Sequence, residues 1–62
     1  MNSNMKYFDK EDILYFKISE DEEMNSVEIN PNNTVELNKS GEIIGVEILN
    51  ASDFLRDLLY FY

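Results

Sequence analysis

The sequence predicts a small α+β domain: an antiparallel β-sheet of about four to five short strands, followed by one C-terminal α-helix packed on one sheet face. Short alternating runs of apolar and polar residues between positions 6 and 49 predict the sheet. Turn-forming segments separate the runs, and the Asn-Pro-Asn-Asn of residues 30–33 is the strongest of them. Apolar residues at helical spacing over residues 54–62 predict the helix.

The strand at residues 43–49 is the longest, and its position in the sheet can be predicted. Both of its faces are largely apolar, which is typical of a strand buried on two sides, so we expect it at the centre of the sheet. Gly45 within it indicates a bulge or a close approach by another backbone. The other predicted strands are residues 6–8, 13–19, 26–29 and 34–38.

Side chains alternate between the two faces of a strand, so the pattern also predicts which residues share a face. Val27 and Ile29 are predicted to point inward. Glu28, Glu36 and Glu47 fall together on the other face, which they share with Tyr15 and Lys17. Within their own strands, one face is predicted to be shared by Leu14, Phe16 and Ile18, by Val35 and Leu37, and by Ile44, Val46 and Ile48.

The predicted helix begins after Asn50, which can cap it, and Asp53 at the third helical position suits the exposed amides there. Residues 58–62 are apolar or aromatic on every side, whereas one apolar stripe would be enough to cover a small sheet. The surplus indicates burial against a second copy or another protein. A C-terminus folded back onto its own sheet explains it equally well, and both alternatives stay open.

The chain of 62 residues corresponds to one domain spanning residues 1–62, with a flexible N-terminus at residues 1–4. A domain of this size buries only about 60% of the surface of its unfolded chain, and short domains usually need a disulfide, a metal or a partner subunit. The sequence contains no Cys and no His, which excludes disulfides, Cys/His zinc sites and imidazole catalysis. We therefore expect a homo-oligomer, with a dimer as the first choice.

The chain is strongly acidic, with 13 Asp and Glu against 5 Lys and Arg and a net charge of −8. Direct binding of nucleic acid or of an anionic membrane requires clustered basic residues, which are absent. Electrostatic steering favours a basic protein partner, although acidity also simply keeps a small protein soluble. Without a signal-peptide core or a long apolar run, a cytoplasmic location is expected.

The best candidate in the sequence for a metal-binding or catalytic site is the group of three carboxylates Glu28, Glu36 and Glu47. Clustered carboxylates can hold Mg²⁺ or Ca²⁺, or act as acid and base. A solvated polar face explains them better, and no nucleophile, phosphate-binding or metal-spacing motif accompanies them. Glu47 lies in an otherwise apolar strand, so its carboxylate requires either an ionic partner such as Lys17 or exposure to water. We expect no cofactor, no metal and no enzyme activity.

Three segments of the chain carry a resemblance to known proteins: residues 9–19 (Asp-Lys-Glu-Asp-Ile-Leu-Tyr-Phe-Lys-Ile-Ser), residues 26–29 (Ser-Val-Glu-Ile) and residues 41–52 (Gly-Glu-Ile-Ile-Gly-Val-Glu-Ile-Leu-Asn-Ala-Ser). Together they resemble a family of short bacterial proteins, the domain of unknown function 2283. The resemblance implies an antiparallel sheet followed by one helix, and no activity is assigned to the family. Members resemble small partners encoded beside putative toxins, which is an association and not a physical argument.

The sequence therefore favours a non-catalytic, self-associating interaction module. An antitoxin-like inhibitor of a basic, RNA-acting toxin is the first alternative, and a carboxylate-based metal-binding or hydrolytic protein is the second. The acidic loop Glu20, Asp21, Glu22 and Glu23 is the candidate contact for a basic partner. The candidate interaction residues are Ile43, Glu47, Leu49, Phe54, Leu58, Leu59, Tyr60, Phe61 and Tyr62.

Overall fold

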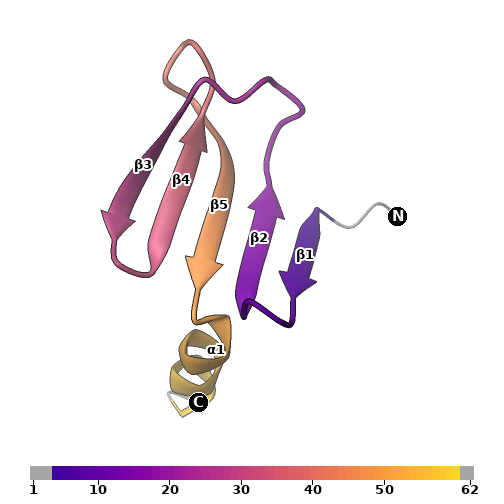
Figure 1. Ribbon diagram of the computed structural model, residues 1–62, viewed down its shortest axis with the longest axis vertical. Helices are drawn as coiled ribbons and strands as arrows, with labels where there is room; N and C mark the ends of the chain where they lie inside the picture. The colour runs from indigo at the N-terminus through magenta and orange to yellow at the C-terminus, as the bar shows by residue number, and fades with distance from the viewer. Residues whose placement is uncertain (1–3, 61–62) are drawn as a thin grey trace.

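The computed structural model describes residues 4–60 and shows an open antiparallel sheet followed by one helix (Figure 1). The predicted α+β fold class is confirmed. The elements are β1 (Met5–Phe8), β2 (Ile13–Lys17), β3 (Asn25–Asn30), β4 (Asn33–Leu37), β5 (Ile43–Leu49) and α1 (Ala51–Tyr60).

The five strands lie in the order β1-β2-β5-β4-β3, and every neighbouring pair is antiparallel. Three hairpins and one longer connection from β2 to β3 produce this order (Figure 1). The central position of β5, predicted from its two apolar faces, is confirmed.

The strand register defines two faces of the sheet. On the apolar face, Leu14 lies opposite Ile48, Phe16 lies opposite Val46, and Val35 lies on the other side of Val46. The polar face carries the alternating residues, among them Tyr15 opposite Glu47. The apolar face also includes Tyr7 and Val27, and the polar face also includes Lys6, Thr34, Glu28 and Glu36.

Two irregularities bend the ladder. The pairing shifts between Glu36 and Leu37 so that Ile44 is an extra residue of β5, next to Gly45. A second shift leaves Ile29 as an extra residue near the end of β3. Ile29 is 61% exposed, so the prediction that it points inward is wrong, because the bulge takes it out of the alternation.

The core of the described chain is small. Leu14, Ile48 and Ala51 form one buried cluster, and Phe16 and Val46 pack against it only partly buried. None of the described side chains is both large and fully buried. A core of this size agrees with the marginal stability expected of so short a domain.

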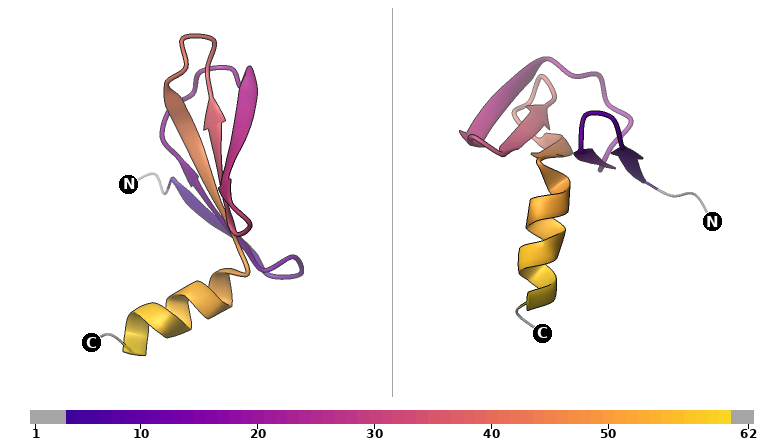
Figure 2. Two further views of the ribbon diagram at one scale, coloured as in Figure 1. Left: turned by 90° about the vertical axis from the view of Figure 1, so that its left-hand side faces the viewer. Right: turned by 60° about the horizontal axis from the view of Figure 1, so that its bottom comes forward.

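The sequence predicted that the helix packs on one face of the sheet, and this prediction is wrong. Helix α1 instead projects from the end of the sheet after β5 (Figure 2). Its apolar residues remain exposed, among them Phe54 at 45% and Leu58 at 44%. The physical reason is that the residues joining β5 to α1, together with the first helical residues, are hydrogen-bonded to the turns on either side of β5. None of the helical segments in the described part of the chain has the length and apolarity needed to cross a membrane.

Candidate protein-interaction site

The first turn of α1 is held by Asp12, which lies in the turn between β1 and β2. Its carboxylate accepts hydrogen bonds from the Ser52 amide (3.0 Å) and the Ser52 hydroxyl (2.6 Å), and its backbone carbonyl accepts one from the Ala51 amide (2.9 Å). Asp12 therefore performs the capping role that usually belongs to the residue preceding the helix. We call these three bonds the Asp12 clamp.

Asn50 was predicted to be the cap, but its side chain is used elsewhere. Its amide donates to the side-chain oxygen of Asn32 at 3.0 Å, in the turn between β3 and β4. Asn50 has a positive φ of 52°, whereas an ordinary capping residue has extended backbone angles that direct its side chain to the helix amides. The junction between β5 and α1 is therefore attached to a turn on each side of β5.

The charge of Asp12 contributes to the clamp. The hydrogen bond from Ser52, and after it the bond from the Tyr7 hydroxyl at 2.7 Å, lower the pKa of the Asp12 carboxyl below its usual value. The same bond raises the pKa of Tyr7. Asp12 itself has a positive φ of 56°, a conformation that Asp tolerates better than other non-glycine residues.

Apolar residues run along one side of α1 and begin in the core. Ala51 is fully buried against Leu14 and Ile48, and the residues that follow it on the same side are exposed. Arg56 lies on the other side of the helix and forms ion pairs with Asp53 (3.6 Å) and Asp57 (3.4 Å). The helix stripe consists of Ala51, Phe54, Leu55, Leu58 and Leu59.

The apolar face of the sheet is also uncovered. Tyr7 is 48% exposed and Val27 is 40% exposed, while Phe16, Val35 and Val46 are half-buried. Ala51 packs against Leu14 and Ile48 of this face, so the helix stripe begins where the apolar face ends. We call the helix stripe and the apolar face together the apolar corner, and none of the residues named in it is Asp, Glu, Lys or Arg.

The polar face contains a tyrosine that crosses the central strand. The Tyr15 hydroxyl donates to Glu36 Oε1 at 2.8 Å and spans Gly45 on β5. A Cβ atom at position 45 would lie 2.7 Å from the hydroxyl and 2.6 Å from Glu36 Oε1, so only glycine leaves room for this bond. The sequence predicted a bulge or a close approach by another backbone at Gly45. The close approach is made by the side chains of Tyr15 and Glu36, and a bulge lies next to Gly45.

The charges around Tyr15 alter its acidity. The hydrogen bond to Glu36 is the largest cause, and burial and the nearby carboxylates add to it, raising the pKa of Tyr15 to about 12. The charge of Glu36 also raises the pKa of Glu23. The polar face therefore concentrates negative charge, in contrast to the apolar corner.

Glu47 lies half-buried on this polar face. Its suggested partner Lys17 instead forms an ion pair with Glu20 at 2.8 Å, so the predicted Glu47–Lys17 pair is not formed. Glu47 lines an open hollow on this face together with Glu11 and Glu36, which agrees with the alternative that it faces water. The part of the chain described here contains no group of three or more acidic side chains arranged to hold a metal ion.

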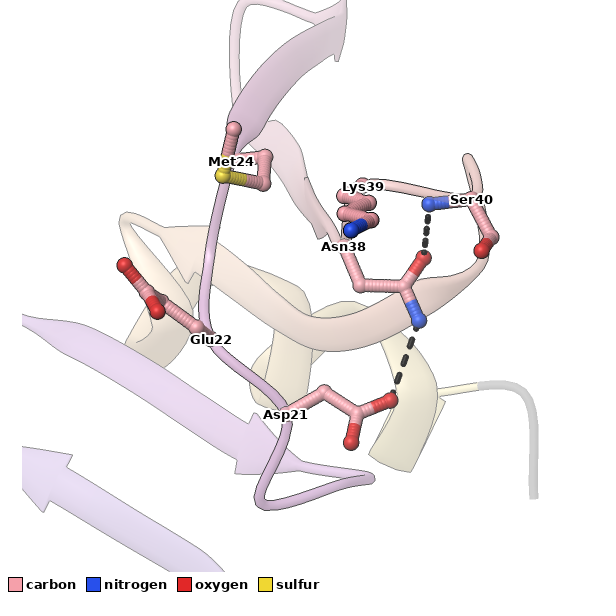
Figure 3. Close-up of a pocket in the computed structure, with 6 residues that line it drawn as sticks. All are labelled: Asp21, Glu22, Met24, Asn38, Lys39 and Ser40. Atoms are coloured by element: carbon pink, nitrogen blue, oxygen red, sulfur yellow. Dashed lines mark hydrogen bonds between the residues drawn. The ribbon is translucent and has the colours of Figure 1, made fainter.

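The acidic loop at residues 20–23 is tethered to the loop between β4 and β5 (Figure 3). Asn38 connects them, because its side-chain amide donates to Asp21 at 3.0 Å while its oxygen accepts from the Ser40 amide at 2.9 Å. Asp21, Glu22 and the nearby Met24 line a shallow hollow of about 270 Å³ together with residues of the β4–β5 loop, among them Lys39 (Figure 3). Asp21 is thus attached to the β4–β5 loop, and all four acidic residues of the loop are exposed.

The predicted interaction residues separate into two groups. Phe54, Leu58 and Leu59 lie in the helix stripe, whereas Glu47 lies on the polar face. Leu49 is half-buried and Ile43 is 49% exposed. Tyr60 is the last residue of α1, and Phe61 and Tyr62 lie outside the described residues.

Sequence reasoning missed Asp12 as the residue that positions the helix. It lies 40 residues before Ser52, so no local pattern connects them. One available signal was that Asp12 and Ser52 both occur in the segments that resemble the family.

The family model described as "Protein of unknown function (DUF2283)" matches residues 4–52. The chain belongs to this family. The match includes all five strands, the Asp12 clamp and the first two residues of α1, so the DUF2283 region of this chain holds the sheet and the anchor of the helix. Neither the curated proteins nor the solved structures contain a match to the chain.

Proposed function

We propose that this DUF2283 chain is a non-catalytic protein-interaction module that associates with a second copy through the apolar corner. The observation that carries the proposal is the exposure of the helix stripe beyond Ala51, where four large apolar residues from Phe54 to Leu59 are 42–75% exposed. Isolated exposed apolar residues are common, but a continuous apolar surface of this kind marks an interaction site.

The distribution of charge supports association with a second copy. Two chains of net charge −8 repel each other, and the repulsion is weakest when the surfaces in contact carry no charge. The apolar corner meets this condition, because Glu28, Glu36 and Glu47 lie on the opposite face of the sheet. Self-association also supplies the buried area that a core built around Leu14 and Ile48 lacks.

Light scattering at micromolar concentration tests this proposal. We expect the mass of a dimer for the unmodified chain and a dissociation constant at least about tenfold higher for Leu58→Gln, because burial of a leucine contributes roughly 1.5–3 kcal/mol. Asp57→Gln, on the charged side of the same helix, is the matched control and is expected to leave the dimer intact. A monomeric mass for the unmodified chain would refute the proposal.

The polar face favours a second candidate function, the binding of a basic protein, of which an antitoxin-like inhibitor is one form. Glu11, Glu36 and Glu47 line an open hollow of about 350 Å³ together with Phe8 and Tyr15. Carboxylates beside aromatic rings suit Lys or Arg side chains.

Titration calorimetry with an Arg- and Lys-rich peptide tests this candidate. The double variant Glu36→Gln, Glu47→Gln is expected to bind more weakly than the unmodified chain, and Glu42→Gln, outside this hollow, serves as its control. Equal heats for all three chains would dismiss a role for the hollow.

A further inference from the structure

The junction between β5 and α1 determines where the helix can go. On one side of β5 the Asp12 clamp holds Ala51 and Ser52. On the other side, Asn32 accepts from the Leu49 amide at 2.8 Å and from the Asn50 side chain at 3.0 Å. Folding α1 back onto its own sheet would require these bonds to break, so the helix stripe and the apolar face of one chain remain uncovered together.

A surface that covers the apolar face must be uncharged, apolar and elongated. The helix stripe has these properties. The apolar face has them too, so each surface suits the other. A basic partner would instead be attracted to the polar face, where the carboxylates lie. Among possible occupants of the apolar face, the α1 helix of a second copy is therefore the best match in chemistry.

The dimensions also agree. The 10-residue helix is about 15 Å long, and the 7-residue β5 is about 23 Å long, so one helix can lie across the sheet without overhanging it. Six side chains of the corner are at least 40% exposed: Tyr7, Val27, Phe54, Leu55, Leu58 and Leu59. If each offers on the order of 90 Å², two copies would bury roughly 1,000 Å², which is near the lower limit of specific interfaces.

We propose that two copies exchange helices, so that α1 of each chain lies across the apolar face of the other chain's sheet. This inference rests on the proposed self-association and specifies its geometry. A two-fold axis relates the copies, and each chain contributes the helix stripe to one half of the interface and the sheet to the other. The Asp12 clamp directs the helix away from its own sheet and toward the partner.

Disulfide cross-linking between two differently tagged chains tests the exchange, and the absence of native Cys makes every cross-link interpretable. One chain carries Leu58→Cys, and the other carries Val46→Cys on the apolar face. After refolding together under oxidising conditions, we expect a disulfide that joins unlike chains. The matched controls are Asp57→Cys on the charged side of α1 and Glu47→Cys on the polar face, which are expected to cross-link at least tenfold less.

The outcomes separate the two proposals. A dimer by light scattering whose Val46→Cys and Glu47→Cys variants cross-link equally would overturn the helix exchange and leave self-association intact. A monomer would overturn both. Because a cysteine variant could fail to fold, a second measurement uses the unmodified chain: nuclear Overhauser effects between a ¹³C-labelled and an unlabelled copy. Contacts between the Leu58 and Val46 methyl groups of different copies are expected, and their absence in a proven dimer would overturn the exchange.

Discussion

Asp12 is the residue on which the direction of the helix depends. It is distant from α1 in sequence, yet its carboxylate receives both hydrogen bonds from Ser52. These bonds favour the ionised carboxylate, so the pKa of Asp12 in the folded chain is lowered below its unfolded value. The stabilisation by Asp12 is therefore fully present above the unfolded pKa and is lost as the pH falls through the lower folded pKa.

Replacement of Asp12 by Asn should weaken the clamp, because a neutral amide cannot accept both Ser52 bonds as a carboxylate does. We expect a melting temperature lower by several degrees at pH 7, with the difference from the unmodified chain shrinking below about pH 4. Thermal unfolding followed by circular dichroism at pH 7, 5 and 3 measures this. Asp9→Asn, in the same turn, is the control, and an equal loss for both variants would contradict the role of Asp12.

Gly45 is the second residue with a specific role, since it leaves space for the Tyr15 ring to reach Glu36. The raised Tyr15 pKa means that the neutral phenol stabilises the fold. This contribution is present below the unfolded pKa of about 10 and is lost as the pH rises toward about 12.

Gly45→Ala should push Tyr15 and Glu36 apart and return the pKa of Tyr15 from about 12 toward 10. We expect a loss of about 1 kcal/mol in the free energy of unfolding, the usual contribution of one hydrogen bond. Titration of the tyrosine Cζ resonances by NMR measures the pKa values. Tyr7, which is bonded to Asp12, serves as the internal control, and an unchanged Tyr15 titration would show that the bond survives the methyl group.

At the scale of elements, α1 combines a well-anchored start with an unsupported remainder. A helix of 10 residues is marginal in water by itself, and most helical stability in proteins comes from packing of the apolar side. Within the described chain, Ala51 is the one member of the helix stripe that is buried. In the proposed dimer, contacts with the other chain would stabilise the second and third turns of the helix.

Dilution should consequently unfold the end of α1 before its start. As the dimer dissociates, we expect the amides of Leu58 and Leu59 to exchange hydrogen at least about tenfold faster, while strands β2 and β5 keep their protection. Hydrogen exchange measured by mass spectrometry at roughly 1 and 100 µM protein follows the end of α1 and the two strands separately. Exchange that is independent of concentration would show that α1 is stable without a partner.

At the scale of the whole molecule, the chain separates its surfaces by chemistry. The apolar corner is uncharged, while the acidic loop and the polar face carry much of the net charge of −8. Bringing two such chains together through the corner leaves long-range repulsion between their acidic surfaces. Salt screens repulsion between charges that are farther apart than the Debye length, which is about 8 Å at physiological ionic strength.

The stability of the proposed dimer should therefore rise with salt, because screening removes repulsion and the proposed interface contains no charged pair that salt would weaken. We expect the dissociation constant to fall several-fold between roughly 50 and 500 mM NaCl. Sedimentation equilibrium at the two salt concentrations measures this, and KCl in place of NaCl controls for a specific effect of the cation. A dimer that dissociates with salt would indicate an interface held by charge instead.

The sequence by itself determined the class of the fold, the central position of β5 and the sorting of carboxylates onto one face. These depend on alternation and on turn residues, which act over a few positions and so are visible in the chain. Only the tertiary structure decided that Asp12 caps α1, that Asn38 tethers the acidic loop and that α1 leaves the sheet. Each of these depends on residues far apart in sequence, such as Asp12 and Ser52. Hydrophobic patterning showed that the helix has an apolar side, and hydrogen bonds at its first turn decided that this side does not cover the sheet from which it emerges.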